Sequence, residues 1–357
     1  GFPCQPFSLS GNQDGFQGNS GEGFLNCLKA IEYTKPKIFI FENVTGFKNL
    51  HGGIFLKIAE RELIKLGYEV DNVTLNAHDF GVPQNRKRIF IIGNNINSGI
   101  PIFTKTNKSP ISVKKAIDDL VGKEGLLPNH EPMKHTQSII ERFSHTLQGE
   151  STREAMDRIP NIGNAKISKQ CYRRLVENKP APTLVANFVT TTIHYSQNRN
   201  ITAREGARIQ SFDDKFIFEG LKTRMSWQKG LSQFEQIGNA VPPKMALEIA
   251  KKVKKMIDGK IKKTNKIYQM SFFDNLDEEY KNVISKIANK RKTSGKRGRK
   301  SKYAKLYLKF EKAKKGTLIK IPPDLNENIF FLETAMRRRN INFKLMKDGK
   351  EVKAKIL

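Results

Sequence analysis

The feature that most constrains the fold of this chain is the alternation of helical apolar stripes with short, unbroken apolar runs. From Phe24 to about Tyr33 apolar residues recur at helical spacing, and Lys35-Pro36 ends that helix before the run Ile38-Phe39-Ile40-Phe41. Such a run is typical of a strand that is buried on both faces. Because the alternation continues, the sequence predicts a parallel α/β sheet. Its further elements are a helical stripe over residues 55–66 and strand-like segments at residues 68–75 and 88–92.

The pattern dissolves after Asn94, and the chain is polar and irregular up to about Lys179, apart from short helical pieces such as residues 137–143. We interpret this segment as an inserted second domain. Order returns at Thr202-Ala-Arg-Glu205, whose spacing is that of a helix capping box. The run from Gly238 to Pro243 then opens a helix that tolerates prolines in its first turn. The apolar side of that helix consists of Met245, Ile249, Ala250, Val253 and Ile257.

The charge of the chain points to its partner. With 64 Lys and Arg against 35 Asp and Glu, the 357 residues carry a formal charge of +29, and the pI is near 9.9. A polyanion gains affinity for such a chain by releasing counterions, so nucleic acid is the expected partner. No apolar stretch approaches the ~18 residues of a membrane-spanning helix and no signal-peptide pattern occurs, so no membrane partner is expected.

The C-terminal part of the sequence is strongly basic. From Lys286 to Lys320 only Glu311 is acidic. This composition indicates a solvated basic tail or, alternatively, a DNA tether in which Arg297 and Arg299 reach into a narrow minor groove. Residues 318–357 are expected to form a small terminal module.

The three cysteines, Cys4, Cys27 and Cys171, form neither a CxxC pair nor a Cys/His cluster at metal-ligand spacing. No disulfide framework or zinc site is therefore expected, and the cysteine usage fits a reducing cytoplasm. We interpret Cys27 and Cys171 as small buried hydrophobic residues, which leaves Cys4 as a free thiol. The histidines show no metal spacing either, and neither a metal nor a catalytic role is expected for them. They include His130, His135, His145 and His194.

Four segments carry the side chains that catalysis needs. Cys4 stands between two prolines in Phe2-Pro3-Cys4-Gln5-Pro6-Phe7-Ser8. Glu42 directly follows the predicted strand 38–41, at the carboxyl end where open α/β sheets build their sites. Residues 84–88, Gln-Asn-Arg-Lys-Arg, supply two alternating guanidinium groups ahead of a strand. Gly238-Asn239 offers a tight turn with an amide side chain.

With these segments in this order and at this spacing, the chain resembles the DNA (cytosine-5)-methyltransferase family over roughly residues 1–257. Phe2 to Ser8 looks like the nucleophile motif, Glu42-Asn43-Val44 like the second catalytic motif, and Gln84 to Arg88 like the Gln-x-Arg-x-Arg motif. Arg204 to Phe212 resembles the helix after the target-recognition domain, and Gly238 to Val241 resembles the last motif.

The resemblance implies a Rossmann-like α/β sheet of the S-adenosylmethionine-dependent methyltransferases, here lacking its first strands. A small irregular target-recognition domain and a basic C-terminal extension would complete the fold. The expected domains are the second half of the catalytic α/β domain at residues 1–94, the target-recognition domain at 95–199, a return to the catalytic domain at 200–260 and the extension at 261–357.

The chemistry of cytosine then suggests a role for each motif. Carbon C5 is too poor a nucleophile to accept a methyl group directly, so a thiolate must first add to C6, and Cys4 would supply it. Addition builds negative charge at N3, which a protonated Glu42 would relieve. The guanidinium of Arg88 would hold the O2 atom, with Arg86 organising the site beside it. The base must be flipped out of the duplex to reach these groups.

Contacts to double-stranded DNA are expected from several further residues. The carbonyl of Phe2 would accept from the exocyclic amine of cytosine, and a mobile Gly-rich loop from Ser8 to Gly18 would close over the DNA. The expected DNA-binding residues are Phe2, Ser8, Ser10, Gln84, Thr183, Arg297 and Arg299. Arg173, Arg174 and Asn187 are further candidates for phosphate or base contacts.

The resemblance also implies S-adenosylmethionine as cofactor. The family holds it mainly with a Gly-rich turn after its first strand and an acidic residue after its second, and no strand-Phe-x-Gly-x-Gly pattern occurs in this sequence. Pro3, Gly23 and Asn239 remain as candidate cofactor residues. Three explanations stay open: a fragment of a longer reading frame, a subunit of a split enzyme whose partner chain carries the cofactor half, or an inactive remnant that binds DNA.

The function expected from the sequence is methyl transfer from S-adenosylmethionine to C5 of a flipped-out cytosine in a specific DNA sequence, through a covalent bond between Cys4 and C6. A restriction-modification system of a bacterium or phage is the expected setting, in the cytoplasm at the nucleoid. Two alternatives remain. One is a non-catalytic DNA-binding protein on the same scaffold, and the other is a methyltransferase that acts on tRNA cytosine.

Overall fold

The computed structural model describes residues 1–2, 22–107, 109–159, 162, 172–223, 230–261, 275–279, 282–283, 318–321, 343–348 and 351–356. The chain divides into two compact units, one of which contains Gly23–Leu276 and the other Asp277–Leu357. The predicted catalytic and target-recognition segments therefore share one unit.

The first unit contains a three-stranded sheet of β1 (Ile38–Val44), β4 (Lys87–Asn94) and β2 (Glu69–Asn76), in that order. Strand β4 lies between the other two and is antiparallel to both, so the expectation of a parallel sheet is wrong for these strands. The reason is the short connection from β2 to β4, which comprises residues 77–86. A parallel crossover needs a dozen residues or more, and this segment can only turn the chain back.

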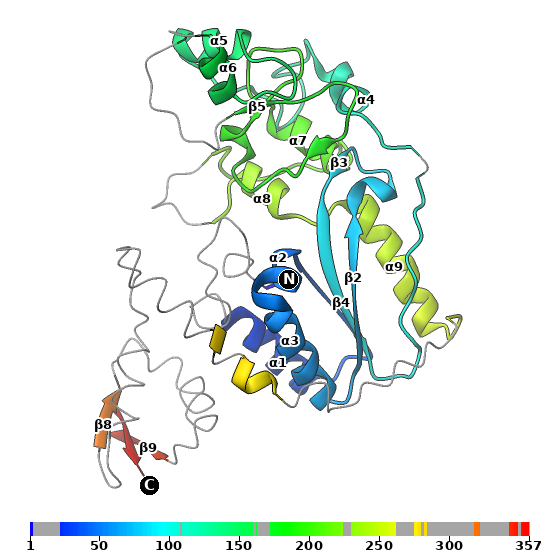
Figure 1. The fold of residues 1–357 in the computed structure, drawn as a ribbon, viewed down its shortest axis with the longest axis vertical. Coiled ribbons are helices and arrows are strands. Elements are labelled where there is room, and N and C mark those ends of the chain that lie inside the picture. Colours follow the sequence, from blue (N-terminus) through cyan, green and yellow to red (C-terminus); the bar gives the residue numbers. More distant parts are fainter. Residues whose placement is uncertain are drawn as a thin grey trace. The chain divides into compact units, whose positions relative to one another are not determined.

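Helices cover both faces of this sheet (Figure 1). Side chains along β1 alternate between the faces, as the pleat requires. Phe41 is buried toward α1 (Glu22–Thr34), where its ring meets that of Phe24 at 6.2 Å between centroids. Ile40 points the other way and packs, half-buried, in a cluster with Met245 of α9 (Pro243–Ile257). The predicted burial on both faces therefore holds fully on one face and partly on the other.

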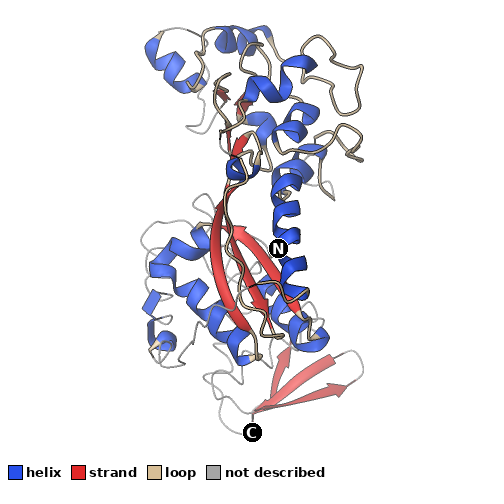
Figure 2. Cartoon of the chain, turned by 90° about the vertical axis from the view of Figure 1, so that its right-hand side faces the viewer, coloured by secondary structure: helices blue, strands red, loops and turns tan. Residues whose placement is uncertain are grey.

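The remaining helices near the sheet follow the predicted stripes. The helix expected at residues 24–33 is α1, and the stripe at 55–66 is α3 (Ile54–Lys65). Figure 2 shows the long curved strands of the sheet with helices on either side. Three short elements connect them: α2 (Gly46–Asn49), η2 (Leu50–Gly53) and η3 (Ala77–Phe80).

A second apolar core joins the segment between β4 and α9. It contains residues from the 113–201 region together with α7 (Ala203–Ile209) and α8 (Gln233–Asn239), so these two helices pack with that region. The capping box predicted at Thr202 and Glu205 is present, as is the short helix predicted at 137–143. The elements of this region are α4 (Val113–Ile117), η4 (Asp118–Leu120), α5 (Gln137–Ser144), α6 (Thr152–Arg158), β5 (Arg173–Arg174), β6 (Ala181–Pro182), η5 (Phe188–Thr190) and β7 (Thr192–Ile193).

The prediction that Gly238-Asn239 opens a helix is wrong. These residues end α8, which begins with its own capping box between Ser232 and Glu235. Helix α9 starts only at Pro243, where a proline at the first position needs no N–H partner. Its buried side consists of Met245, Ile249 and Met256, whereas Ala250 and Ile257 of the predicted stripe are exposed.

In the second unit, β8 (Leu318–Ile321), β10 (Glu351–Ile356) and β9 (Phe343–Asp348) form an antiparallel sheet in that order. These strands fall within the terminal module expected at residues 318–357. Among the described residues of the whole chain, no helix has the length and apolar character needed to cross a membrane.

Candidate active site

The first two residues of the chain are anchored against the end of β1. The ring of Phe2 is buried among those of Phe24, Phe41 and Phe47, at centroid distances of 5.3, 5.9 and 5.3 Å. The buried amide of Asn43 donates from Nδ2 to the carbonyl oxygen of Phe2 at 3.2 Å. This contact gives Asn43 of the Glu-Asn-Val motif a role that the sequence reasoning missed, since only its neighbour carries an ionisable group.

Glu42 and Arg88 form the charged pair of this region. Strand β1 continues to Val44, so Glu42 lies within the strand and not after it as predicted. Its Oε1 atom lies 3.1 Å from Nε of Arg88 across β1 and β4, and both side chains are partly exposed. Gly1 lies beside them, since a Cβ atom built on it would be 3.5 Å from Oε2 of Glu42. The structure thus brings the predicted acid, the predicted base clamp and the start of the chain together.

Arg86 is buried and binds the protein interior. Its Nη1 donates to the carbonyl oxygen of Leu184 and its Nη2 to that of Gly238, both at 3.0 Å. Gly238 has no room for a side chain, because a Cβ atom would lie 2.4 Å from the carbonyl oxygen of Val185. The glycine of the last motif is therefore needed for close backbone approach, and Arg86 holds two chain segments near the Glu42–Arg88 pair.

Gln84 is also fully buried, so its side chain does not reach the surface where the sequence predicted a DNA contact. Its Oε1 accepts from the N–H of Leu184, and its Nε2 donates to Oε1 of Gln210, both at 3.1 Å. Thr183, a second predicted DNA contact, is half-buried and donates from its hydroxyl to the carbonyl of Asn85 at 2.9 Å. These bonds fasten β3 (Gln84–Asn85) to the segment that follows β6.

The residues predicted to hold the cofactor are not brought together by any contact within the described part of the chain. Gly23 is half-buried in the first turn of α1, and Asn239 is exposed at the last residue of α8. They offer one backbone and one amide group, too few for a ligand with a charged amino acid, a ribose and a base. Gly23 and Asn239 alone therefore do not make up a site for S-adenosylmethionine within the described part of the chain.

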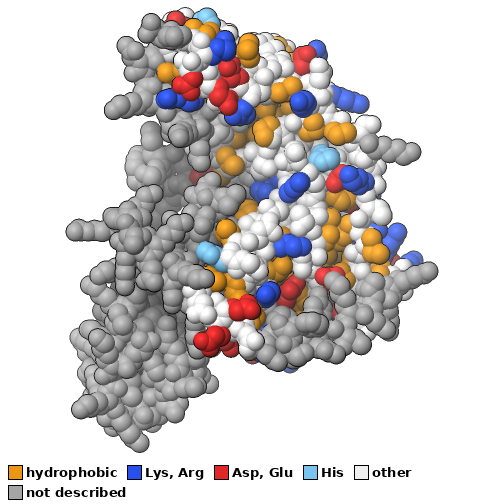
Figure 3. Space-filling model, in the orientation of Figure 1, with side chains coloured by type: hydrophobic (Ala, Val, Ile, Leu, Met, Phe, Trp, Pro, Cys, Tyr) orange, Lys and Arg blue, Asp and Glu red, His pale blue; other side chains and the backbone are white. Residues whose placement is uncertain are grey.

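Two arginines predicted as DNA contacts differ in burial. Arg174 is buried and donates to several acceptors, among them the carbonyl oxygens of His194 and Gln197 at 2.8 Å, so its side chain supports loops inside the protein. Arg173 and Asn187 are exposed and remain at the surface. On the face drawn in Figure 3, the described Lys and Arg side chains are spread among acidic and apolar ones and do not gather into one patch.

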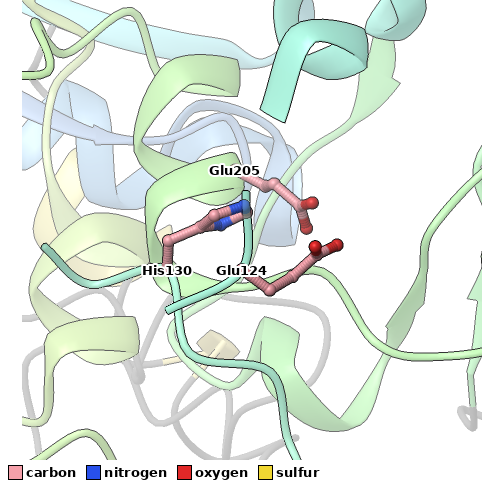
Figure 4. A group of neighbouring side chains, drawn as sticks. All are labelled: Glu124, His130 and Glu205. Atoms are coloured by element: carbon pink, nitrogen blue, oxygen red, sulfur yellow. The ribbon is translucent and has the colours of Figure 1, made fainter. Parts of the chain in front are cut away.

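Figure 4 shows a cluster of Glu124, His130 and Glu205, whose ligand atoms lie within 4.8 Å of one another, close enough to share a metal ion. The guanidinium of Arg199 already binds both carboxylates, since its Nη2 donates to Oε1 of Glu124 and to Oε1 of Glu205, at 2.7 Å each. Both ring nitrogens of His130 have hydrogen-bond partners, at 2.8 and 2.9 Å. A metal ion would have to displace the guanidinium, so we interpret the cluster as a structural ion pair.

His194 extends this network into the interior. Its side chain is fully buried, and Nε2 lies 3.7 Å from Oε1 of Glu205. Burial is the main cause that lowers the pKa of His194 to about 4, against an ordinary value near 6.5. The imidazole is therefore neutral at pH 7.

Stability is expected to fall in mild acid because of His194. The depressed pKa means that the unfolded chain takes up the proton from about pH 6.5 downward while the folded protein resists it until about pH 4. The associated stability is present above pH 6.5 and is lost as the pH falls toward 4, by roughly 2 kcal/mol at pH 5. Urea unfolding at pH 7.5 and pH 5 measures this loss in the free energy of unfolding. The His194→Gln variant should lose less stability between these pH values than wild type, and His145→Gln, at an exposed histidine, should behave as wild type. An equal loss in all three proteins would contradict the assignment.

Several predicted site residues lie outside the described residues. They are Pro3, Cys4, the loop from Ser8 to Gly18 with Ser8 and Ser10, Arg297 and Arg299. Cys171, interpreted from the sequence as a small buried hydrophobic residue, also lies outside them.

Comparison with known proteins identifies the family. A family model for C-5 cytosine-specific DNA methylase matches residues 1–255. The Type II methyltransferase M.DdeI of Desulfomicrobium norvegicum is 36% identical over 297 residues, which cover 71% of this chain and 71% of that protein. The Type II methyltransferase M1.HphI of Haemophilus parahaemolyticus is 33% identical over 262 residues, covering 72% of this chain and 67% of its own length.

A solved structure agrees at the level of the fold. The crystal structure of a putative DNA modification methyltransferase encoded within a prophage of E. coli superposes with a TM-score of 0.51 and 23% identity, over 67% of this chain and 75% of the other. Together with the matched family model, these similarities mean that the chain belongs to the C-5 cytosine-specific DNA methylases, the DNA (cytosine-5)-methyltransferases.

Proposed function

We propose that this protein methylates C5 of a flipped-out cytosine within a specific sequence of duplex DNA, as the modification enzyme of a restriction-modification system, through a covalent bond between Cys4 and C6. Membership of the family implies S-adenosylmethionine as the methyl donor. The Type II names of the relatives support the restriction-modification setting. An enzyme of this kind meets its substrate in the cytoplasm, at the nucleoid.

The observation that carries the proposal is the Glu42–Arg88 pair beside the anchored start of the chain. Phe2 is fixed by three aromatic rings, and Cys4 follows it by two residues in the sequence. Two residues of extended chain span at most about 7 Å. We propose that the thiol of Cys4 acts together with this carboxyl and this guanidinium on one cytosine ring.

The proposed reaction on the cytosine side has three parts. The thiolate of Cys4 adds to C6, which breaks the C5–C6 double bond and places electron density on C5 and, through the ring, at N3. In its protonated form, Glu42 donates a proton or a strong hydrogen bond to N3 as charge develops there, and Arg88 binds the O2 atom. After C5 has taken the methyl group, its hydrogen leaves as a proton to water and the thiolate departs from C6. N3 returns its proton to the carboxylate of Glu42, which restores the ring.

The carbonyl oxygen of Phe2 is suited to recognise cytosine. That oxygen accepts one bond from Asn43, and a carbonyl oxygen has two lone pairs. The second can accept from the exocyclic amine of cytosine, which thymine lacks. Ser8, Ser10 and Thr183 are proposed to contact the DNA, and Arg297 and Arg299 to tether it.

Because neither the sequence nor the described residues provide the Gly-rich turn of the family, we propose that a further segment or a partner chain completes the binding site for S-adenosylmethionine around Pro3, Gly23 and Asn239.

The proposal is tested by hydrogen exchange at C5, which needs no methyl donor. Once the thiolate has added to C6, C5 takes a proton from water and then loses its original hydrogen when the thiolate departs. Random-sequence duplex DNA labelled with tritium at C5 of cytosine should therefore release tritium into water when incubated with the full chain. Release from labelled tRNA but not from duplex DNA would assign the enzyme to RNA, and release from neither would overturn the catalytic proposal in favour of a DNA-binding protein.

A further inference from the structure

A groove lined by lysines runs along α9, away from the residues assigned to catalysis. One wall is formed by the second half of the helix and the residues just after it, and the other by Phe80, Phe103, Thr104 and Thr106. Its volume is about 390 Å³. The basic residues that line it are Lys251, Lys252, Lys254, Lys255 and Lys260, and the acidic ones are Glu248 and Asp258.

The acidic residues of the groove neutralise only some of these lysines. Glu248 lies 2.6 Å from Nζ of Lys251, and Asp258 lies 3.8 and 3.9 Å from those of Lys254 and Lys260. Among the described residues, Lys252 and Lys255 have no ion-pair partner. They are three positions apart on α9 and so project from the same side of the helix. The groove therefore presents two uncompensated ammonium groups side by side.

The opposite wall adds hydrogen-bond donors and no uncompensated acid. Thr104 and Thr106 line the groove, and the backbone there is fixed because the N–H of Thr106 donates to the carbonyl of Asp79 at 3.1 Å. The carboxylate of Asp79 is itself paired with Lys105 at 3.0 Å. A groove lined by lysines and threonines offers ammonium and hydroxyl donors, which are suited to phosphate oxygens.

A plainer account of these lysines is that cations stabilise the C-terminal end of a helix dipole. This explains Lys254 and Lys255, which lie in the last turn of α9. The helix dipole does not explain Lys252, because its effect on cations falls off within the last turn. Lys252 lies more than one turn before the end of the helix. A dipole also needs no groove with hydroxyl groups on its far wall.

We propose that this lysine groove binds the phosphodiester backbone of DNA outside the base pair that is methylated. The inference rests on the proposed action on duplex DNA. A dedicated pocket for a free nucleotide orients its ligand with buried polar groups, whereas the lysines and threonines here are exposed or at most half-buried. Helix α9 is about 22 Å long, so a contact near its C-terminal half would lengthen the DNA segment that the enzyme holds.

The test compares two double variants of the full chain that remove the same charge. Lys252→Ala with Lys255→Ala empties the groove of its uncompensated lysines, and Lys57→Ala with Lys65→Ala removes two exposed lysines of α3. Binding of a fluorescent 40-base-pair duplex is measured against NaCl concentration, and thermal melts check folding. The groove variant should reduce the slope of log K against log[salt] by about 2 and weaken binding roughly 10- to 30-fold at 0.15 M salt.

This experiment measures the affinity for DNA, whereas the proposed function is tested by the release of tritium from C5. Failure of the groove proposal can therefore be distinguished from failure of the proposed function. An unchanged slope in the groove variant, or an equal change in the α3 variant, would overturn the groove as a DNA contact. Inorganic pyrophosphate is tested alone by calorimetry. Micromolar binding that the groove variant loses would assign the groove to a small phosphate ligand and would also overturn the proposal.

Discussion

Replacing Cys4 with serine is expected to abolish tritium release from C5 of cytosine, with a loss on the order of 10⁴- to 10⁶-fold. A thiol forms its anion far more readily than an alcohol, and the anion is the species that adds to C6. Serine keeps the size of the side chain and removes only this property. The rate of tritium release and the dissociation constant for duplex DNA are measured together, and binding should persist while release is lost.

Cys27 provides a matched control in the same chain. It lies on α1 with an intermediate degree of burial, and burial raises the pKa of its thiol, so it forms thiolate less readily than an exposed cysteine. Cys27→Ser should therefore release tritium at the wild-type rate. Retained release in Cys4→Ser, or a comparable loss in Cys27→Ser, would exclude Cys4 as the nucleophile.

Elements whose apolar spacing is local were predictable from the sequence. The stripes of α1 and α3 and the run of β1 each specify their own element, because one segment carries the whole periodic signal. The capping box of α7 is equally local, since Thr202 and Glu205 bond to each other's backbone N–H groups. The direction of β4 was not predictable from its own residues, because it depends on how far the connecting segment can reach.

The roles of buried polar residues were the hardest to predict. Gln84, Arg86 and Arg174 look like surface groups in the sequence, since polar side chains are usually exposed. In the structure their partners are carbonyl and amide groups up to about 150 positions away along the chain, such as Gly238 for Arg86. No pattern in one sequence encodes those pairings. The family motifs still marked these positions as important, and the structure gives Gln84 and Arg86 a supporting function inside the protein.

Glu42→Gln is expected to lower the rate of tritium release by about 10²- to 10⁴-fold, the usual contribution of a general acid. Glutamine fills the same space beside Arg88 and can still hydrogen-bond, but it cannot give a proton to N3 as the thiolate adds to C6. Glu62→Gln is the matched control, because Glu62 also pairs with an arginine, Arg61 at 3.0 Å, but lies on α3. The control should release tritium at the wild-type rate.

Comparing the double variant of Glu42 and Arg88 with the two single variants tests whether both residues act on the same cytosine ring. The two side chains are 3.1 Å apart at one end of the sheet. If both bind the same cytosine, the double variant Glu42→Gln with Arg88→Met should lose less than the product of the two single losses, because either change alone already disturbs the shared site. Losses that multiply would mean independent roles, and wild-type release from Glu42→Gln would remove the carboxyl from the mechanism. Since the exchange at C5 requires addition of the thiolate to C6 but no methyl donor, a loss in this assay reports on the cytosine side of the reaction alone.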